Sequence, residues 1–399
     1  MHRSFKTILL TLLAGGLLPA CSEDQQPEPE AETQRTYRIA TFNIAMGLPE
    51  MGAMRSALES GEDPRLIALA AVLQTVRPDV VLLNEFDFDP AIDAAYLLNR
   101  NYLERPQLEN EPISYAHSFQ PAVNTGVDSG LDLDGDSVLA EPEDAWGYGV
   151  FPGQYGMLIL SRQPILEREV RSFQRLPWAN LPDPRIPVKE DGAPYYPDSV
   201  WSQLRLSSKN HVDVPILLDG HRIHLFASHP TPPVFDGPED RNGKRNHDEL
   251  AFWVHYITDP DAGWIRDDQG TAGGFASGDP FIIAGDLNAD PSDGDAVPGA
   301  IAQLLDHPAI DPGCVPTSTG GAEAAELQGG VNPSHHGDPA ADTSDFSDDT
   351  VGNYRLDYVL PSRGLAIEGC GVLWPDSGSD FHTTATFSDH RLVWIDIAL

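Results

Sequence analysis

The chain has 399 residues, of which 41% are hydrophobic, and this is enough to bury one large core or two ordinary ones. It carries 25 Lys and Arg against 61 Asp and Glu, a formal net charge of −36. Such an excess repels polyanions at long range and argues against sequence-independent binding of nucleic acid through a basic surface. Any phosphate that the protein handles must be met locally, for instance by a bound cation.

The N-terminal residues have the pattern of an export signal. Residues 1–20 combine a basic start, an apolar run too short to span a membrane comfortably, and a small-residue cleavage site just before Cys21. This pattern resembles a bacterial lipoprotein signal with Cys21 as the lipidated residue, and the alternative is an ordinary secretory signal. Residues 21–36 predict a flexible tether, so the predicted folded domain runs from 37 to 399.

These features predict a protein exported and lipid-anchored at the bacterial cell envelope, with the outer membrane as the first choice, and otherwise secreted or periplasmic. Cys314 and Cys370 would then face an oxidising compartment, where a disulfide is permitted although the sequence leaves their pairing open. The chain has no Cys-x-x-Cys pair, so a thiolate zinc site is not expected.

Hydrophobic periodicity predicts mostly strands in chain order. Residues 37–44 alternate like a strand with Asn43 near its end, 65–76 have helical spacing, and the next dry strand ends at Asn84 and Glu85. Further strands are predicted at 155–161, 221–229, 281–284, 355–361 and the C-terminus, and a helix at 246–257. This order indicates an α+β fold of sheets covered by helices, with long insertions at 104–153, 175–200, 258–279 and 315–352.

Several of the predicted strands end in a carboxylate, an amide or an imidazole. Burying such groups is costly unless they are paired or coordinated, so the repeated placement predicts one shared polar site. Its candidate members are Asn43, Glu85, His229, Asp286, Asn288, Asp357, Asp389 and His390. Oxygen ligands without thiolates suit Mg²⁺, or Mn²⁺ or Ca²⁺, better than zinc.

Six short motifs occur in a fixed order along the chain: TFNI, NE after PDVVLL, SH after HRIHLFA, GDLN, RLDYVL and SDH. In this order they resemble the endonuclease/exonuclease/phosphatase superfamily over about residues 37–399. Each motif alone is weak, but their ordered sum is specific. The resemblance implies a four-layer αββα sandwich, with two mostly antiparallel sheets face to face, and a metal-dependent phosphoesterase site where the loops of the sheets meet.

The resemblance also implies roles for individual residues. Glu85 would be the principal metal ligand, with Asn43 and Asp389 nearby. The catalytic residues would be His229, Asp286, Asn288, Asp357 and His390. Among these, Asp357 would fix the tautomer of His390, and whether Asp286 or His390 takes the proton stays open. The sequence departs from the family pattern at Asn84, where the family usually has Gln.

Basic and polar residues near the predicted site could bind the substrate. Lys209 and His211 precede the histidine strand, while Arg245 and Asn246 open a predicted helix, where backbone amides attract anions. The alternatives are a solvated lysine and basic residues paired with neighbouring acids. The acidic run 132–143 has calcium-loop spacing and is interpreted as a solvated loop, with a structural calcium site as the alternative. The run 338–349 is interpreted as a disordered or solvated loop.

We therefore expect an exported phosphoesterase that hydrolyses phosphate mono- or diesters by in-line attack of water. A small ester at the cell surface is the first choice, an extracellular nuclease the second, and a sphingomyelinase-type lipid reaction the third. The non-enzyme alternative is a surface binding protein on an inactive scaffold. Nucleic acid is expected only as a substrate, the membrane is contacted through the lipid anchor, and no protein partner is implied.

Overall fold

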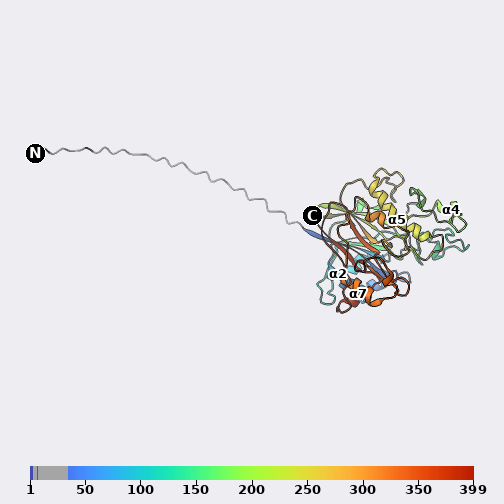
Figure 1. Ribbon diagram of the computed structural model, residues 1–399, viewed down its shortest axis with the longest axis horizontal. Helices are drawn as coiled ribbons and strands as arrows, with labels where there is room; N and C mark the ends of the chain where they lie inside the picture. Colours follow the sequence, from blue (N-terminus) through green and yellow to red (C-terminus); the bar gives the residue numbers. More distant parts are fainter. Residues whose placement is uncertain (3–6, 8–34) are drawn as a thin grey trace. The chain divides into compact units, whose positions relative to one another are not determined.

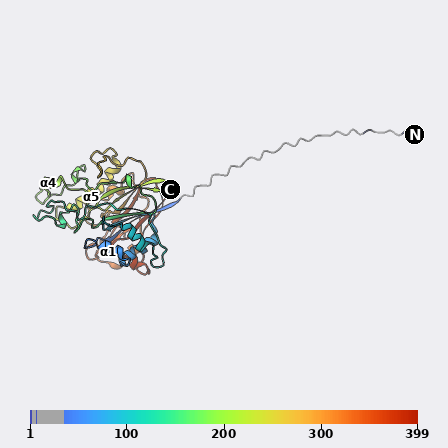
Figure 2. The ribbon, with the colours of Figure 1, turned by 180° about the vertical axis from the view of Figure 1, so that it is seen from behind.

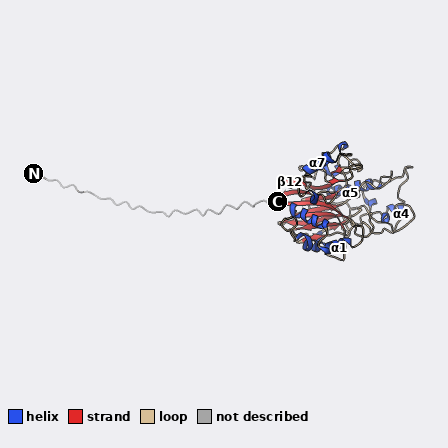
Figure 3. Cartoon of the chain, turned by 90° about the horizontal axis from the view of Figure 1, so that it is seen from below, coloured by secondary structure: helices blue, strands red, loops and turns tan. Residues whose placement is uncertain are grey.

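The computed structural model describes residues 1, 2, 7 and 35–399. Cys21, nearly all of the predicted signal and most of the predicted tether lie outside the described residues. Within 35–399 two β-sheets pack face to face, and helices cover their outer faces (Figure 1 and, coloured by secondary structure, Figure 3). The predicted α+β sandwich is confirmed.

The two sheets share a plan in which one central pair of strands is parallel and the other pairs are antiparallel. The first sheet has the order β12 (Ala366–Val372), β13 (Val393–Ala398), β1 (Thr36–Met46), β2 (Val80–Phe86), β4 (Met157–Ser161) and β3 (His117–Phe119), with β1 and β2 parallel. The second has the order β11 (Asp357–Pro361), β8 (Phe281–Asp286), β7 (His221–Ser228), β6 (His211–Leu218) and β5 (Arg171–Ser172), with β7 and β8 parallel. A separate ribbon pairs β9 (Ser344–Asp345) with β10 (Asn353–Tyr354).

The helices lie on the outer faces and in the long connections. They are α1 (Ala53–Ser60), α2 (Pro64–Val76), α3 (Ala94–Leu98), α4 (Asp198–Trp201), α5 (Arg241–Thr258), α6 (Ala302–Leu305), α7 (Thr319–Gln328) and α8 (His382–Ala385). A π-helical turn, η1 (Asn99–Leu103), follows α3, and 3₁₀ turns occur at η2 (Pro142–Asp144), η3 (Glu167–Glu169), η4 (Trp178–Asn180), η5 (Asn332–Ser334) and η6 (Pro339–Ala341). Seen from behind, α1 and α5 lie on opposite sides of the strands (Figure 2). None of the helices in the described part of the chain is both long and apolar enough to cross a membrane.

Three apolar layers hold the sandwich together, and the period-2 alternation of the strands creates them. In β8, Ile282 belongs to the core between the sheets, whereas its neighbour Ile283 belongs to the core under α5 with Phe252. A third core packs α1, α2 and α3 on the first sheet, and it includes Leu69 of α2. Helix α2 starts where the Asp63 side chain accepts the amides of Arg65 and Leu66, as an N-cap does.

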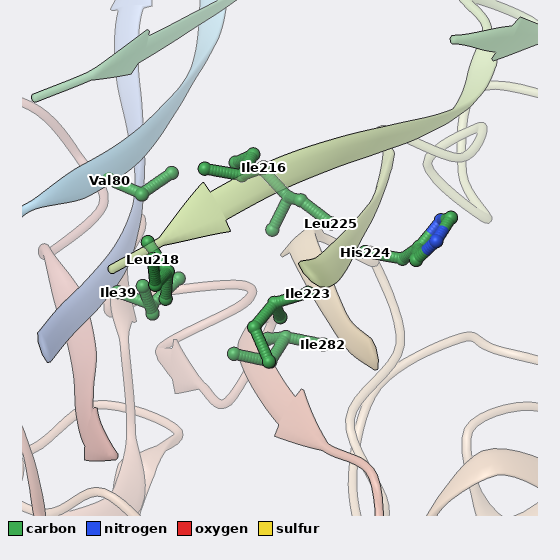
Figure 4. A pocket seen from close by; sticks show the side chains of 8 residues that line it. All are labelled: Ile39, Val80, Ile216, Leu218, Ile223, His224, Leu225 and Ile282. Carbon is green, nitrogen blue, oxygen red and sulfur yellow. The ribbon is translucent and has the colours of Figure 1, made fainter. Parts of the chain in front are cut away.

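A small cavity of about 10 Å³ lies in the core between the sheets (Figure 4). Apolar side chains near the start of β1, β2 and β8, from the middle of β7 and from the end of the antiparallel β6 surround it, while the ring of His224 points away from them. It therefore marks the end of these strands opposite to the end at which Asn43, Glu85 and Asp286 lie.

Two parts of the chain differ from the sequence expectation. Helix α7 forms within 315–352, and the run 338–349 is not solvated throughout, because Asp342, Thr343 and Ser344 are buried. Backbone pairing of Ser344 with both Tyr354 and His390 holds this run against the sheets. A disulfide joins Cys314 and Cys370, with 6.2 Å between their Cα atoms.

Candidate active site

Asn43 connects the two sheets at the site. Its side-chain amide, at the end of β1, donates to Glu85 Oε1 at 3.1 Å and to Asp286 Oδ2 at 2.9 Å. Glu85 belongs to the first sheet and Asp286 to the second, and Asn43 itself is 1% exposed. One amide thus brings together carboxylates that lie more than 200 positions apart in the sequence.

The backbone takes unusual conformations where the site side chains leave the strands. Glu85 and Asn288 both have left-handed backbones, with φ of 58° and 51°. Gly285 has φ 152°, and a Cβ at this position would lie 2.0 Å from the carbonyl oxygen of Ser228. A glycine before Asp286 is therefore required for β7 and β8 to approach so closely.

Asn84, the departure from the family pattern, keeps a link between the sheets. Its Oδ1 accepts the hydroxyl of Thr41 at 3.2 Å and the backbone amide of Asp286 at 3.3 Å. The shorter side chain thus still reaches the strand that carries Asp286. Asn84 therefore lies behind the site, where it holds the backbone of Asp286 and does not face a substrate.

His390 and Asp357 form a buried hydrogen-bonded pair. His390 Nδ1 lies 2.8 Å from Asp357 Oδ2, which also accepts the hydroxyl of Thr343 at 2.8 Å. Asp357 is the direct partner of Asp286 in the β11–β8 register, so His390 Nε2 comes within 3.7 Å of Asp286 Oδ2. This arrangement directs Nδ1–H at Asp357 and Nε2 at the site.

The charges of this group act on each other because all of them are buried. Burial opposes protonation of His390, but the carboxylates of Asp357 and Asp286 outweigh it and raise the pKa of the imidazole. Burial also opposes ionisation of Asp286, yet His390 and the hydrogen bonds from His229 and Asn43 hold its pKa below the usual range. An ionised Asp286 therefore lies beside a protonated His390.

His229, just after β7, and Lys209, just before β6, complete a group of side chains that we call the inner group. Its other members are Asn43, Glu85, Asp286, Asp357 and His390. His229 Nε2 lies 3.4 Å from Asp286 Oδ2, while its buried Nδ1 has no partner within the described residues. Burial, and then the charge of Lys209, lower the pKa of His229. Lys209 is buried as well, with Nζ 3.5 Å from the carbonyl of Pro230, and burial lowers its pKa although Glu249, Glu85 and Asp286 oppose this.

The other predicted substrate-binding residues hold the loops around the site. Asn246 donates to the carbonyls of Thr231 and Leu287 at 2.9 and 3.0 Å, and so fixes the segment that leads to Asn288. Arg245 donates to three backbone carbonyls, those of Leu206, Trp146 and Arg205.

His211 has both ring nitrogens engaged, Nδ1 with the Ser207 hydroxyl and Nε2 with the Glu249 carbonyl, and burial lowers its pKa to about 3. Arg245, His211 and the side-chain NH₂ of Asn246 thus bind the protein itself, whereas Asn246 Oδ1 has no partner among the described residues, and the substrate-binding roles stay predictions.

Asn288 and Asp389 lie beside the inner group rather than within it. Asn288 donates its side-chain amide to the carbonyl of Pro230 at 3.1 Å, and its backbone amide to Asp286 Oδ1 at 3.0 Å. Asp389 is exposed, and its Oδ1 accepts a long hydrogen bond of 3.4 Å from Ser388. The Ser388 hydroxyl also donates to the Asn43 carbonyl at 2.8 Å, which ties this loop to β1. The metal role of Asp389 stays a prediction.

The donor set fits a hard divalent cation. Asp286, Asp357 and His390 each offer a ligand atom, and these atoms lie within 4.8 Å of one another. The His390 hydrogen bond uses Asp357 Oδ2, whereas Asp357 Oδ1 has no partner among the described residues, and Asn43 brings the Glu85 carboxylate beside this group; such oxygen donors suit Mg²⁺ or Ca²⁺. Asp132, Asp134 and Asp136 form a second group, but they are mostly exposed and accept amides of their own loop.

Two residues near the site escaped the sequence analysis. Thr343, which orients Asp357, lies in the run interpreted as solvated, where nothing local marks one threonine. Tyr155 packs its ring against the backbone of Gly47, and burial, followed by the charge of Glu85, raises its pKa. A glycine without room for Cβ beside an aromatic ring is visible only in three dimensions.

Comparison with known proteins identifies the family of the chain. A family model described as Endonuclease/Exonuclease/phosphatase family matches residues 40–390. A comparison with curated proteins finds no match. Among solved structures, the chain is similar to an endonuclease/exonuclease/phosphatase from Beutenbergia cavernae, with 19% identity, 92% of this chain and 72% of that chain covered, and a TM-score of 0.48. It is also similar to sphingomyelinase C from Streptomyces griseocarneus, with 18% identity, 91% and 99% covered, and a TM-score of 0.49. Because the family model spans most of the chain, including every residue of the inner group, the protein belongs to the endonuclease/exonuclease/phosphatase family.

Proposed function

We propose that the protein is an exported, divalent-metal-dependent phosphoesterase that hydrolyses phosphate mono- or diesters by in-line attack of water. Family membership implies metal-dependent phosphoesterase or nuclease chemistry. The observation that carries the proposal is the convergence of Asn43, Glu85 and Asp286 from two facing sheets, beside the pair of His390 and Asp357. No simpler structural need explains so many buried polar groups at one place.

The residues of the inner group divide the work of such a reaction. Glu85 would hold the cation, and Asn43 would orient the carboxylates of Glu85 and Asp286. A bound divalent cation neutralises charge on the phosphoryl oxygens. Asp286, being ionised, accepts the proton of the attacking water, because His390 already carries one and instead stabilises the anion. His229 donates from Nε2 to a phosphoryl oxygen as negative charge develops there.

We expect a small phosphate ester rather than a nucleic-acid duplex as substrate. The net charge of −36 repels a polyanion. In addition, Arg245 binds three backbone carbonyls and Lys209 is buried, so neither offers an exposed contact to an extended phosphate backbone. A nuclease of the same family is the second candidate, favoured by the diesterase chemistry that this site shares with it.

The test is hydrolysis by the chain without its signal and Cys21. We expect release of p-nitrophenol from p-nitrophenyl phosphate or bis-p-nitrophenyl phosphate with Mg²⁺, Mn²⁺ or Ca²⁺, and plasmid DNA assayed in parallel separates a nuclease from an esterase acting on small substrates. Glu85→Gln should lower the rate at least about 100-fold, since it removes a charge aimed at the reacting centre. The matched control Glu59→Gln, on the exposed surface of α1, should keep the wild-type rate. Hydrolysis of none of the three substrates, or full activity of Glu85→Gln, would contradict the proposal and favour a non-catalytic binding protein.

Export and lipid anchoring form a separate part of the proposal. They are supported by the signal-like residues 1–20 and by the disulfide between Cys314 and Cys370, a bond that persists in oxidising compartments. In a bacterial host, we expect the full chain in the membrane fraction with a diacylglyceryl adduct on Cys21 by mass spectrometry. Cys21→Ser should move the protein to the soluble fraction, and a variant that stays in the membrane would contradict the anchor.

A further inference from the structure

A second pocket lies between α7 and the turns η5 and η6, and none of its lining residues belongs to the inner group of the active site. Its volume is about 340 Å³, within the range of roughly 300–1,000 Å³ that small-molecule sites occupy. The polar groups that line it belong to Asp293, Glu326, Asn332, His335 and Asp342. Neither Lys nor Arg is among the lining residues, so the pocket is electronegative.

Asp342 is the buried acidic residue of this pocket that has no hydrogen-bond donor or ion-pair partner within the described residues. The residue is only 7% exposed, yet its carboxylate accepts no hydrogen bond and makes no ion pair within the described residues. Asp293 differs, because its carboxylate accepts the backbone amides of His336 and Gly337. Its oxygens are not sealed from solvent, because they open into the pocket, and a ligand from outside the chain can therefore reach them.

The surroundings of Asp342 add negative charge rather than remove it. Burial, followed by the charges of Asp290, Asp293 and Asp338, raises the pKa of Asp342 to about 8. The one base in the lining, His335, has Nδ1 at 3.1 Å from the carbonyl of Asn353 and stacks its ring on Tyr354. The charge that would satisfy Asp342 is therefore a cation, and the described residues do not supply it.

The walls decide between a metal ion and an organic cation. Within the described residues, the sets of three or more His, Cys, Asp or Glu ligand atoms close enough to share an ion do not include Asp342. The remaining lining is apolar or small, and consists of Ala322, Ala325, Pro333, Gly337 and Pro339. Such walls suit a carbon skeleton, and a volume of this size exceeds what a bare ion needs.

We propose that this pocket binds a small aliphatic ammonium compound, whose N–H groups donate to Asp342 while its carbon chain contacts the Ala and Pro wall of the pocket. This site is distinct from the active site and does not depend on the proposed function. Asp342 is nevertheless the direct neighbour of Thr343, whose hydroxyl donates to Asp357. A ligand on Asp342 is therefore bound next to Thr343, the residue that orients Asp357.

The test is isothermal titration calorimetry of the full folded domain with n-butylamine and with putrescine, at pH 8.5. We expect at least one amine to bind with a dissociation constant below about 10 mM, and the neutral analogue 1-butanol not to bind. Asp342→Asn should weaken amine binding at least about tenfold, because it removes the charge while keeping the shape. Ala325→Leu should weaken it as well by filling the pocket, and the matched control Asp349→Asn, an exposed acid of the same segment, should bind like wild type.

Three results would overturn the proposal. The first is that neither amine binds wild type, and the second is that binding persists in both Asp342→Asn and Ala325→Leu. The third is competition by MgCl₂ that is lost with Asp342→Asn, since this would identify a metal site. Thermal unfolding of each variant shows whether it is folded, and the assay of p-nitrophenyl ester hydrolysis is not needed for any of these outcomes.

Discussion

At the scale of single residues, the burial and hydrogen bonds of Asp357 determine how it acts on His390. Oδ2 accepts from both His390 and Thr343, whereas Oδ1 is buried without a partner in the described part of the chain. Burial, opposed by the charge of His390, raises the pKa of Asp357 to about 6. A carboxylate kept in such surroundings is useful because it fixes the imidazole proton on Nδ1.

Because Asp357 contacts His390 directly, we expect Asp357 to act in the reaction through His390. Asp357→Asn should lower kcat by about 10²–10⁴-fold with a small change in KM, because it removes a carboxylate that keeps His390 protonated and oriented. The measurement is a double-mutant cycle with His390→Asn, in which the double variant should be no slower than His390→Asn alone. Effects that multiply would show that the two residues work independently. Unchanged unfolding midpoints in denaturant would exclude a loss through misfolding.

At the scale of elements, the parallel pair of β7 and β8 sets the position of Asp286. The pairing runs from His224 and Phe281 to Ala227 and Ala284, and the next residue of β8 is Gly285. Its missing side chain lets the carbonyl of Ser228 approach, and the following residue then enters the site. The position of the carboxylate therefore depends on contact between two strands.

Gly285→Ala tests this dependence. The added Cβ would lie 2.0 Å from the carbonyl oxygen of Ser228, so the strands must separate. We expect a loss of unfolding free energy of about 1–3 kcal/mol, measured by urea denaturation, together with loss of hydrolysis. Gly220→Ala is the matched control, since Gly220 also has a positive φ but has open space around its Cβ, and it should cost only the backbone strain and keep activity. Equal losses in the two variants would refute a role for close strand approach.

The elements also show how far sequence could predict this protein. The sequence predicted β1, α2 and β8 from the apolar, alternating or helically spaced runs 37–44, 65–76 and 281–284. In these runs the spacing of apolar residues alone indicates which side chains are buried. Helix α7 was missed since its buried residues are only Gly320 and Gly321, which make no apolar stripe. The convergence of side chains at the site followed from the motifs, but the use of Arg245 as a clamp on three carbonyls is tertiary and has no local pattern.

At the scale of the whole molecule, the net charge of −36 leaves few cations for the carboxylates, so the stability of the fold depends on where each carboxylate lies. Among the buried acids in the described part of the chain, Asp87 and Asp342 make no ion pair and have a raised pKa. Burial raises the pKa of Asp87 to about 7, against two backbone hydrogen bonds, and that of Asp342 to about 8. Between the unfolded and the folded pKa of such a group, the native state holds a proton that the unfolded state has lost. Stability therefore falls as pH rises through that window.

This linkage gives a prediction for Asp342→Asn without any ligand. The groups that act on Asp342 are Asp290, Asp293 and Asp338, with Glu326 and His335 also in the lining of the pocket. As pH rises from 3.8, the ordinary pKa of Asp, to about 8, the free energy of unfolding of the wild type falls, because Asp342 loses its proton in the unfolded state first. The amide of the variant does not titrate. The free energy of unfolding of Asp342→Asn should therefore exceed that of wild type, by more at pH 8.5 than at pH 5.

Urea denaturation at both pH values measures this difference, and Asp87 cancels because both proteins contain it. Saturating putrescine at pH 8.5 should narrow or reverse the difference, because only the wild-type carboxylate gains a partner. A difference that does not change with pH would mean that Asp342 is solvated in the native protein. In that case water would satisfy the carboxylate, and the proposal of a cation in the pocket would be contradicted.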